Sequence, residues 1–396
     1  MTYRVTIFCP DRHIVYDGRT PRDRGVGGGI TARIRMAHAL QRRGHDVTLV
    51  VNCPRRERFD GVEYVPIDAM ERLDGDILIL TTSGDTLDLS PALALPRRAG
   101  LTIAWVHGPV KPGGYDEIDW DSNYAVSNFI GDVARDRWGI AGDRIFVSYN
   151  AFEESLFVQA EAEGRRRDPY RLVYFSHPSK GLDTALAVLE RLRSFDRRFH
   201  LRVLGGDGLW GGDDSLTELP EGASFAGLSG QEHLAGELLQ AGFSLQMQAR
   251  EEPGALAIVE AFRAGCVIVA SPVGCYPEMV VDRENGLMIE GDHSDGPVRD
   301  VAARRILDLV RDPTAMAGIR RESMKAPWSS DRMAEAWEGH WACLLHAPSS
   351  LVHISTAACP RCGGDHLILA DGAHCRSCSL YSSPARRNGD AARRVA

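Results

Sequence analysis

Two glutamates stand on either side of a proline-glycine step in the stretch EEPGALAIVEAFRAGCVIVASPVG, residues 251–274. Pro253 and Gly254 interrupt regular structure after an apolar run, and the segment that follows has helical spacing. Glu252 is therefore expected just before a helix, whereas Glu260 is expected inside it among apolar residues. The amide groups at such a helix start can bind phosphate oxygens.

Burying a carboxylate such as that of Glu260 is costly unless several hydrogen-bond donors satisfy it. The two hydroxyls of a nucleotide's ribose would supply two donors to one carboxylate. Ordinary structural roles are the alternative: Glu260 on a solvent-facing position of the helix, and Glu252 as a charge that favours the helix start.

A second candidate for phosphate binding is the glycine-rich loop GVGGG, residues 25–29, between an expected strand at 2–8 and a helix that begins near Ile30. Glycines let the backbone approach a phosphate closely, and the helix start adds partial positive charge. The spacing does not match the dinucleotide fingerprint G-x-G-x-x-G. A flexible surface loop is the alternative interpretation.

Apolar runs of strand length alternate with helical patterns in both halves of the chain. Expected strands span 2–8, 45–51, 76–82, 101–107 and 144–150 in the first half and 171–177, 200–206, 243–249 and 266–272 in the second. Expected helices span 30–44, 181–195, 229–242 and 255–265, the third with Ser229 and Glu232 at capping-box spacing. This alternation predicts an α/β protein with two Rossmann-like, doubly wound parallel-sheet domains, which bind ligands at the carboxyl ends of their strands.

Composition and charge narrow the class of protein. The 396 residues are 44% hydrophobic and 25% charged, without an apolar run of the ~18 residues that a membrane span needs or a basic, then apolar, signal pattern. We therefore expect a cytoplasmic protein. The net charge of -8 makes nucleic acid an unlikely partner, yet residues 1–60 carry twelve arginines against six acidic residues. That surplus suits a phosphorylated substrate or peripheral contact with an anionic membrane; a solvated basic face is the alternative.

Four cysteines near the C-terminus have metal-site spacing. Cys359 and Cys362, with Cys375 and Cys378, give C-x2-C-x12-C-x2-C, which resembles a zinc ribbon. Four thiolates complete a tetrahedral structural Zn2+ site, and the metal would supply most of the folding free energy of so small a module. Two disulfides in an oxidising compartment are the alternative. The intervening residues are neither basic nor aromatic, so a lid or interaction role is expected rather than DNA binding.

Three segments resemble retaining family 4 glycosyltransferases of the GT-B fold: residues 251–274, GGGITARIRMAHALQRRGHDVTLV and FSHPSKGLDTAL. They occur in the same order as in that family, and the resemblance extends over about residues 1–345. The resemblance implies two domains facing a central cleft, with acceptor binding in the first and the nucleotide-sugar donor in the second. The implied parts are an acceptor-binding domain at 1–160, a donor-binding domain at 161–330, a crossover helix at 331–350 that packs back on the first domain, a zinc ribbon at 355–382 and a disordered tail at 383–396.

The resemblance also assigns roles to residues. Glu260 would bind the donor ribose and Glu252 the transferred sugar, while Lys180 would neutralise the diphosphate. His107 would lie near the sugar; a core histidine is the alternative. The full set of implied donor-binding residues is Gly28, Gly29, Ser176, Lys180, Glu252, Gly254, Ala255, Leu256 and Glu260, and the implied catalytic residues are His107, Lys180 and Glu252.

One departure concerns the diphosphate: where the family usually has an arginine upstream of the lysine, this chain has Ser176 and His177. Another arginine would then have to substitute. The implied reaction is transfer from a nucleoside-diphosphate sugar, with retention of configuration and without a catalytic metal, to a small-molecule, glycan or lipid-linked acceptor. Alternatives are a nucleotide-sugar epimerase or glycoside hydrolase on the same fold, or a non-catalytic scaffold protein that works through its zinc ribbon.

Overall fold

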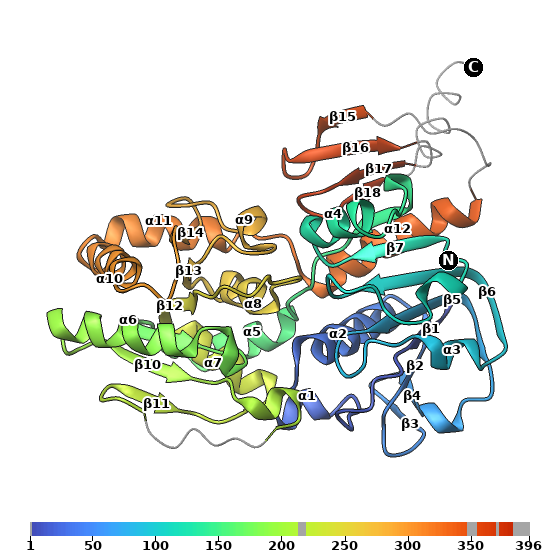
Figure 1. Cartoon of the computed structure of the whole chain (residues 1–396), viewed down its shortest axis with the longest axis horizontal. Helices are drawn as coiled ribbons and strands as arrows, with labels where there is room; N and C mark the ends of the chain where they lie inside the picture. Colours follow the sequence, from blue (N-terminus) through green and yellow to red (C-terminus); the bar gives the residue numbers. More distant parts are fainter. Residues whose placement is uncertain (1, 213–218, 347–354, 370–371, 383–396) are drawn as a thin grey trace. The chain divides into compact units, whose positions relative to one another are not determined.

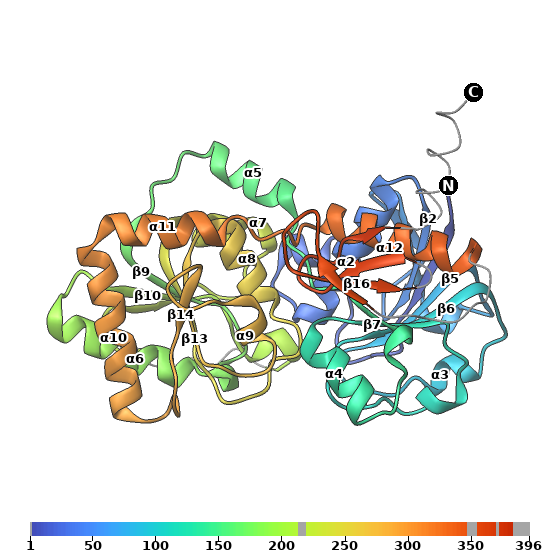
Figure 2. The same cartoon turned by 90° about the horizontal axis from the view of Figure 1, so that it is seen from above.

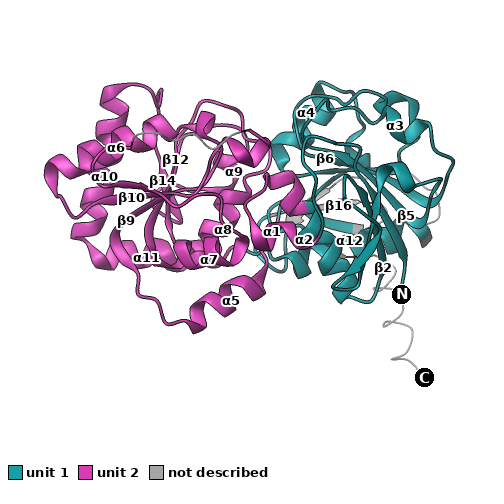
Figure 3. Ribbon diagram, turned by 90° about the horizontal axis from the view of Figure 1, so that it is seen from below, with its two compact units in different colours: residues 1–17, 33–150, 327–396 teal, residues 18–32, 151–326 magenta. Residues whose placement is uncertain are grey.

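The computed structural model describes residues 2–212, 219–346, 355–369 and 372–382. The chain divides into two compact units, shown in different colours in Figure 3. Unit 1 comprises residues 1–17, 33–150 and 327–396, and unit 2 comprises residues 18–32 and 151–326. Each unit is built on its own parallel sheet, so the predicted α/β class with two parallel-sheet domains is confirmed.

Unit 1 contains an eight-stranded sheet in the order β3-β4-β2-β1-β5-β6-β7-β8. Its pairs are parallel except for the antiparallel pair of β3 and β4. The strands are β1 Arg4–Phe8, β2 Asp46–Val51, β3 Glu57–Phe59, β4 Val62–Pro66, β5 Leu73–Thr82, β6 Arg97–Val106, β7 Ser122–Ala125 and β8 Ile145–Val147. The central strands are almost entirely buried, as their apolar sequences require.

Helices cover both faces of this sheet (Figure 2). Helices α2 (Gly28–Arg42) and α12 (Ser330–His346) lie on one face, and α3 (Ser90–Leu93) and α4 (Asn128–Asp136) on the other. Short 3-10 turns follow or precede strands at η1 Ile67–Ala69, η2 Tyr115–Glu117 and η3 Gly142–Arg144. Trp337 and Trp341 of α12 are completely buried, and the Trp337 indole donates a 2.6 Å hydrogen bond to Ser148 Oγ. The apolar stripe of α12 is thus packing, as its spacing predicts.

Unit 2 contains a six-stranded, wholly parallel sheet in the order β11-β10-β9-β12-β13-β14. The strands are β9 Asp168–Tyr174, β10 His200–Val203, β11 Ala223–Phe225, β12 Ala241–Gln246, β13 Val267–Ala270 and β14 Gly286–Met288. Helices α6 and α10 lie on one face, and α7, α8 and α11 on the other (Figure 2). The helices are α1 Thr20–Asp23, α5 Glu154–Ala162, α6 Leu182–Phe195, α7 Gln231–Gln240, α8 Leu256–Ala264, α9 Tyr276–Met279, α10 Gly296–Arg311 and α11 Pro313–Ser323, with 3-10 turns η4 Pro178–Lys180 and η5 Asp207–Trp210.

The cysteine-rich segment forms a small antiparallel sheet of its own. Its strands are β15 Ser355–Ala358, β16 Asp365–Leu369, β17 Gly372–Cys375 and β18 Tyr381–Ser382, in chain order across the sheet. Figure 1 shows this sheet beside α4 and α12 of unit 1. Among the helices that the structure describes, none combines the length and apolar character needed to cross a membrane.

Two expectations differ from the structure, and one falls outside the residues that it describes. The boundary between the units falls at 150/151 rather than at 160/161, and residues 18–32 group with unit 2. The capping box at Ser229 does not form, because Gly230 occupies the N-cap of α7 and the Ser229 hydroxyl donates to the carbonyl of Ala226 instead. The expected tail, 383–396, lies outside the described residues.

Candidate functional site

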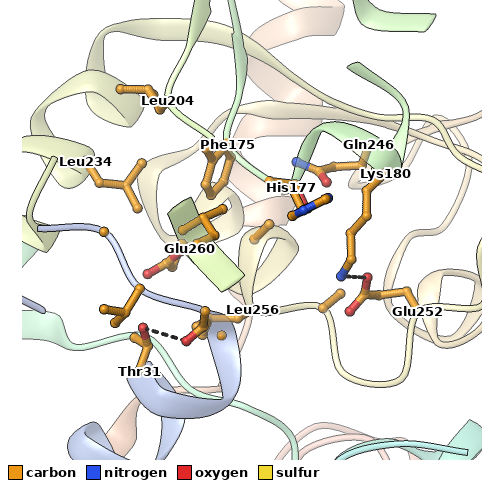
Figure 4. Close-up of a pocket in the computed structure, with 18 of the residues that line it drawn as sticks. Thr31, Phe175, His177, Lys180, Leu204, Leu234, Gln246, Glu252, Leu256 and Glu260 are labelled. Carbon is orange, nitrogen blue, oxygen red and sulfur yellow. Dashed lines mark hydrogen bonds and ion pairs between the residues drawn. The ribbon is translucent and has the colours of Figure 1, made fainter. Parts of the chain in front are cut away.

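A pocket of unit 2 lies at the carboxyl ends of β9 and β12 and at the start of α8 (Figure 4). Parallel strands end there at the same edge, so the loops that follow them meet. The pocket is lined by eight of the residues predicted to bind the donor: Gly28, Ser176, Lys180, Glu252, Gly254, Ala255, Leu256 and Glu260. Gly29, the remaining one, follows Gly28 in α2 and is not among the lining residues.

Lys180 and Glu252 form an ion pair inside this pocket. The Nζ atom of Lys180 lies 2.7 Å from Oε2 of Glu252, and the two side chains are only 19% and 11% exposed (Figure 4). Lys180 ends the turn η4, and the left-handed Gly181 that follows packs directly against the carbonyl of Met247 at the end of β12. A side chain at position 181 would separate these loops, so glycine is what brings the lysine to the carboxylate.

Gln248, Tyr276 and Cys275 form a hydrogen-bonded network with Glu252. Gln248 donates through Nε2 to the hydroxyl of Tyr276 at 2.7 Å and lies 3.4 Å from Oε2 of Glu252. The backbone carbonyl of Glu252 accepts a 2.9 Å hydrogen bond from the amide of Cys275. Burial, followed by the charge of Glu252, raises the pKa of both Cys275 and Tyr276. These supporting residues were not predicted, because nothing in their spacing relates them to the glutamate.

Gly274 gives a testable prediction about this support. Its φ is +55°, and a Cβ there would lie well inside contact distance of the backbone N and O of Glu252. We expect Gly274→Ala to lower the free energy of unfolding by about 2–4 kcal/mol and to displace Glu252. Gly164→Ala is the control, since Gly164 has a φ of +67° with no atom near its Cβ position and should cost only about 1 kcal/mol. Equal losses in urea unfolding would contradict a specific contact with Glu252.

Glu260 lies in the second turn of α8 and is 4% exposed. Figure 4 shows its carboxylate and that of Glu252 with Leu256 between them in this view. The solvent-facing alternative for Glu260 is therefore wrong. Apart from Glu260 and Arg263 the helix that carries it is apolar, and most of its residues are buried, which fixes the position of the carboxylate at the pocket.

At the start of α8, the amides of Ala255 and Leu256 already have partners within the chain. The Leu256 amide already donates to the carbonyl of Gly254 at 2.8 Å, which closes a tight turn before the helix. The Ala255 amide faces the Cys275 thiol and partly offsets the rise in the pKa of that thiol caused by burial. The Leu256 amide thus has a partner within the chain, and the residue lines the pocket.

The glycine-rich loop forms another wall of the same pocket. Gly25, Val26, Gly27, Gly28 and Thr31 line it, and α2 begins at Gly28. The amides of Ile30 and Thr31 both donate to the carbonyl of Gly27 at 3.1 Å. The amides of the first helical residues, Gly28 and Gly29, have no carbonyl acceptor within the helix. The loop therefore contributes to the pocket of unit 2, with Gly25 and Val26 buried and Gly28 exposed.

His177 lines the pocket where the family resemblance leads one to expect an arginine nearby. Its Nδ1 accepts hydrogen bonds from the amide and the hydroxyl of Ser179 at 3.2 and 2.9 Å. Its Nε2 lies 3.3 Å from Oδ1 of Asp207, and its ring stacks on Trp210 with centroids 3.7 Å apart. Ser176 is held through its backbone, which contacts Gly205 so closely that a Cβ there would not fit.

His107 belongs to unit 1, so it is not one of the residues that the pocket of unit 2 brings together. It follows β6, and its ring lies 4.6 Å from that of Trp105 between centroids. Its Nε2 atom is buried without a hydrogen-bond partner. Loss of hydration, followed by the charge of Arg33, lowers the pKa of His107 to about 3.

The lowered pKa of His107 predicts an acid-sensitive stability of unit 1. Between the ordinary value of 6.5 and about 3, the unfolded chain binds a proton that the folded chain does not. The free energy of unfolding should therefore fall as the pH falls, by up to about 1.4 kcal/mol per pH unit from this residue. We expect His107→Gln to flatten the dependence between pH 6.5 and 4, measured by urea unfolding with tryptophan fluorescence. An unchanged slope, equal to that of a His233→Gln control at an exposed histidine, would contradict this.

The four cysteines near the C-terminus come together, with all their sulfur atoms within 4.8 Å of one another. The Sγ atoms of Cys359 and Cys378 are 3.7 Å apart, and those of Cys362 and Cys375 are 3.5 Å apart. A tetrahedral zinc ion with bonds of about 2.3 Å requires sulfur separations of about 3.8 Å, whereas a disulfide requires about 2.05 Å. The donor set and its spacing therefore fit a metal ion.

The ribbon, by which we mean residues 355–382, is anchored on the edge of the unit 1 sheet. The carbonyl of Val147 in the edge strand β8 accepts hydrogen bonds from Nε2 of His374 and from the Ser379 hydroxyl, both at 3.0 Å. The Phe146 ring stacks on His374 and on His340 of α12, with centroid distances of 4.3 and 4.4 Å. The ribbon is therefore a packed part of unit 1.

The match to a known protein family lies within unit 2. Residues 170–312 match the family of glycosyl transferases group 1. This range runs from β9 to the end of α10 and so includes Lys180, Glu252 and Glu260. A glycogen synthase from Mesorhizobium japonicum is 26% identical over 269 residues, which cover 61% of this chain and 56% of that protein. The match thus spans little more than half of that relative.

Solved glycosyltransferase structures resemble nearly the whole chain. AviGT4, a glycosyltransferase involved in avilamycin A biosynthesis, aligns with a TM-score of 0.61 at 19% identity, over 87% of this chain and 98% of that one. Anabaena HepE in complex with UDP-glucose aligns with a TM-score of 0.60 at 14% identity, over 85% and 99% of the two chains. At these identities the likeness shows the fold, which is that of GT-B glycosyltransferases.

Proposed function

We propose that the protein is a retaining glycosyltransferase that moves a sugar from a nucleoside-diphosphate sugar to an acceptor. The observation that carries this proposal is the convergence of Lys180, Glu252 and Glu260 in one pocket with two helix starts. The match of residues 170–312 to the glycosyl transferases group 1 supports it. HepE, which shares the fold, was solved with UDP-glucose.

In this proposal each carboxylate binds hydroxyls. Glu260 accepts from the ribose hydroxyls, and its burial makes those two charge-assisted hydrogen bonds strong. Glu252 accepts from a hydroxyl of the transferred sugar. Because Glu252 also pairs with Lys180, sugar and diphosphate binding are coupled through one ion pair. Gly28 and Gly29 approach the phosphates with their backbone amides.

Catalysis then consists of stabilising the departing diphosphate. Negative charge grows on that group as the bond to the anomeric carbon breaks, and fixed amides and a lysine are suited to it. We propose that no catalytic metal is needed, because Lys180 and the backbone amides of the pocket can stabilise the charge of the departing diphosphate. The departing phosphate takes the acceptor proton, so a separate side-chain base is not required.

We further propose that the ribbon holds one structural Zn2+ through Cys359, Cys362, Cys375 and Cys378. A hydrogen bond from Cys378 is the main cause that lowers the pKa of Cys375 to about 5, which favours a thiolate ligand. The packing of the ribbon on β8 and α12 supports a structural role over that of a separate scaffold module.

For the acceptor, we propose two loops as the binding segments, residues 10–25, which carry several arginines, and residues 111–121. Several arginines of the basic N-terminal region are engaged in ion pairs, as with Arg12 and Asp68, Arg43 and Glu338, and Arg58 and Asp46. These pairs reduce the charge that a membrane would meet. Three statements stay predictions: peripheral membrane contact, a cytoplasmic location and the absence of a nucleic-acid partner.

The first experiment is a calorimetric screen of the zinc-loaded protein against UDP, GDP, ADP and TDP. We expect saturable binding of at least one of the four, and turnover of the matching nucleotide sugar in the presence of a chelator that spares the ribbon. Absence of binding by all four to fully zinc-loaded protein would overturn the proposal and favour a scaffold protein that works through the ribbon.

A further inference from the structure

Trp210 lines the pocket, and the proposed donor-binding residues do not include it. It ends the turn η5, is 40% exposed, and lies beside the glycine-rich loop, where a Cβ at Gly27 would be 3.5 Å from the indole. The imidazole of His177 stacks on it almost in parallel, at an interplanar angle of 15°. The partly exposed ring lines the pocket and can therefore contact both a ligand and neighbouring side chains.

Positive groups gather around this ring. The guanidinium of Arg250 lies 5.2 Å from the Trp210 ring centroid, and the ammonium of Lys180 lies 5.8 Å from it. Both distances are those of cation–π contacts, for which tryptophan is the best partner. Burial, together with the charges of Lys180 and Arg250, lowers the pKa of His177, while Asp207 acts in the opposite direction. The charge of Arg250 therefore acts on His177, a residue that lines the pocket.

The charge inside the pocket shows why a further cation matters. Among the described residues that line it, Lys180 is the single lysine or arginine, against the two carboxylates of Glu252 and Glu260. The charge of Lys180 is moreover matched by Glu252 at 2.7 Å. A diphosphate would add about two negative charges to a lining that already has more acid than base. His177, with its lowered pKa, is neutral at pH 7 and does not change this balance.

We propose that Arg250 is the second cation for the donor diphosphate and that Trp210 is the residue that positions it, with the His177 ring fixing the indole from one side. The inference rests on the proposed function of the pocket. Arg250 is exposed and stands two residues before Glu252, in the loop between β12 and α8. It thus reaches the pocket from a different loop than the one in which the family has its arginine, and Trp210 takes over the task of holding it there.

The test uses inorganic pyrophosphate together with whichever nucleoside diphosphate binds the parent protein, and the corresponding nucleoside as a probe without phosphate. Calorimetry of the full zinc-loaded chain should show that Arg250→Ala weakens pyrophosphate and nucleoside diphosphate roughly ten- to a hundredfold, with nucleoside affinity unchanged. Arg250→Lys should recover part of the loss. Arg198→Ala is the matched control, because Arg198 makes a comparable contact with Tyr170 at 4.0 Å, outside the pocket lining.

A double-mutant cycle on Trp210 and Arg250 tests whether the two residues act together in phosphate binding. We expect Trp210→Leu to lose phosphate affinity as Arg250→Ala does, the double variant to be no weaker than either single one, and Trp210→Phe to retain most of the affinity. If Trp210→Leu instead loses nucleoside affinity and keeps pyrophosphate, the ring stacks on the base and the positioning role is overturned. If Arg250→Ala binds both phosphate ligands like the parent while Lys180→Ala does not, the role of Arg250 is overturned and the donor site stands. If the parent binds no diphosphate, the proposed function itself fails.

Discussion

Glu260→Ala should reduce the affinity for the cognate nucleoside diphosphate by about a hundredfold or more, while the fold is kept. The carboxylate is 4% exposed and lines the pocket from the second turn of α8. Each hydrogen bond from a ribose hydroxyl to a buried charge contributes about 1.5–3 kcal/mol, so losing two of them accounts for such a change. Calorimetric titration with the diphosphate and with its 2′-deoxy analogue measures the loss directly.

The deoxy analogue separates a ribose contact from general damage. If Glu260 binds the diol, the parent protein should bind the 2′-deoxy analogue more weakly, and Glu260→Ala should no longer distinguish the two ligands. Glu232→Ala, at an exposed glutamate of α7, is the matched control and should bind like the parent. A Glu260→Ala variant that still prefers the ribose form would refute the assignment of Glu260 to the ribose.

Removing the metal from the ribbon should lower the stability of unit 1 and not only that of the ribbon. The ribbon covers the Phe146 ring and donates two hydrogen bonds to the Val147 carbonyl at the sheet edge. Without metal the four cysteines lose what holds them together, because so small a module has little core of its own. We expect Cys375→Ser to cost at least about 3 kcal/mol in unfolding free energy and to lower the melting temperature by about 6 °C or more.

The comparison variant for the ribbon is Ser377→Ala, since Ser377 is an exposed neighbour of the cysteines. It should bind one zinc per chain, measured by metal analysis, and melt like the parent. A chelator strong enough to strip zinc should lower the melting temperature of the parent and of Ser377→Ala equally, and leave Cys375→Ser unchanged. A parent protein that keeps its melting temperature after losing its zinc would show that the ribbon does not support unit 1.

The sequence identified the residues of the candidate site that are tied to a single helix start. Glu252, Pro253 and Glu260 are close in the chain, and the break before α8 follows from proline and glycine chemistry. The strands with long apolar runs, such as β5 and β13, were also predictable, because burial on both faces leaves a continuous apolar signal.

What escaped prediction depends on contacts between distant segments. Strand β7 is fully buried although it contains Ser122 and Asn123, whose polar groups are satisfied by tertiary contacts such as the hydrogen bond between Tyr115 and Asn123. Gly274 and Gly181 are essential because of the backbone that packs against each of them, which spacing alone does not reveal. The two cations beside Trp210, Lys180 and Arg250, likewise come from two loops that are distant in the sequence.

The grouping of residues 18–32 with unit 2 bears on how this protein can be dissected. The chain passes from one unit to the other at 17/18, 32/33, 150/151 and 326/327, so no single cut yields two self-sufficient fragments. A fragment spanning 151–326 would lack Gly25, Gly27, Gly28 and Thr31, which form one wall of its pocket. Such a fragment should recover ligand binding only when the missing fifteen-residue segment is supplied in trans or is joined to it by circular permutation.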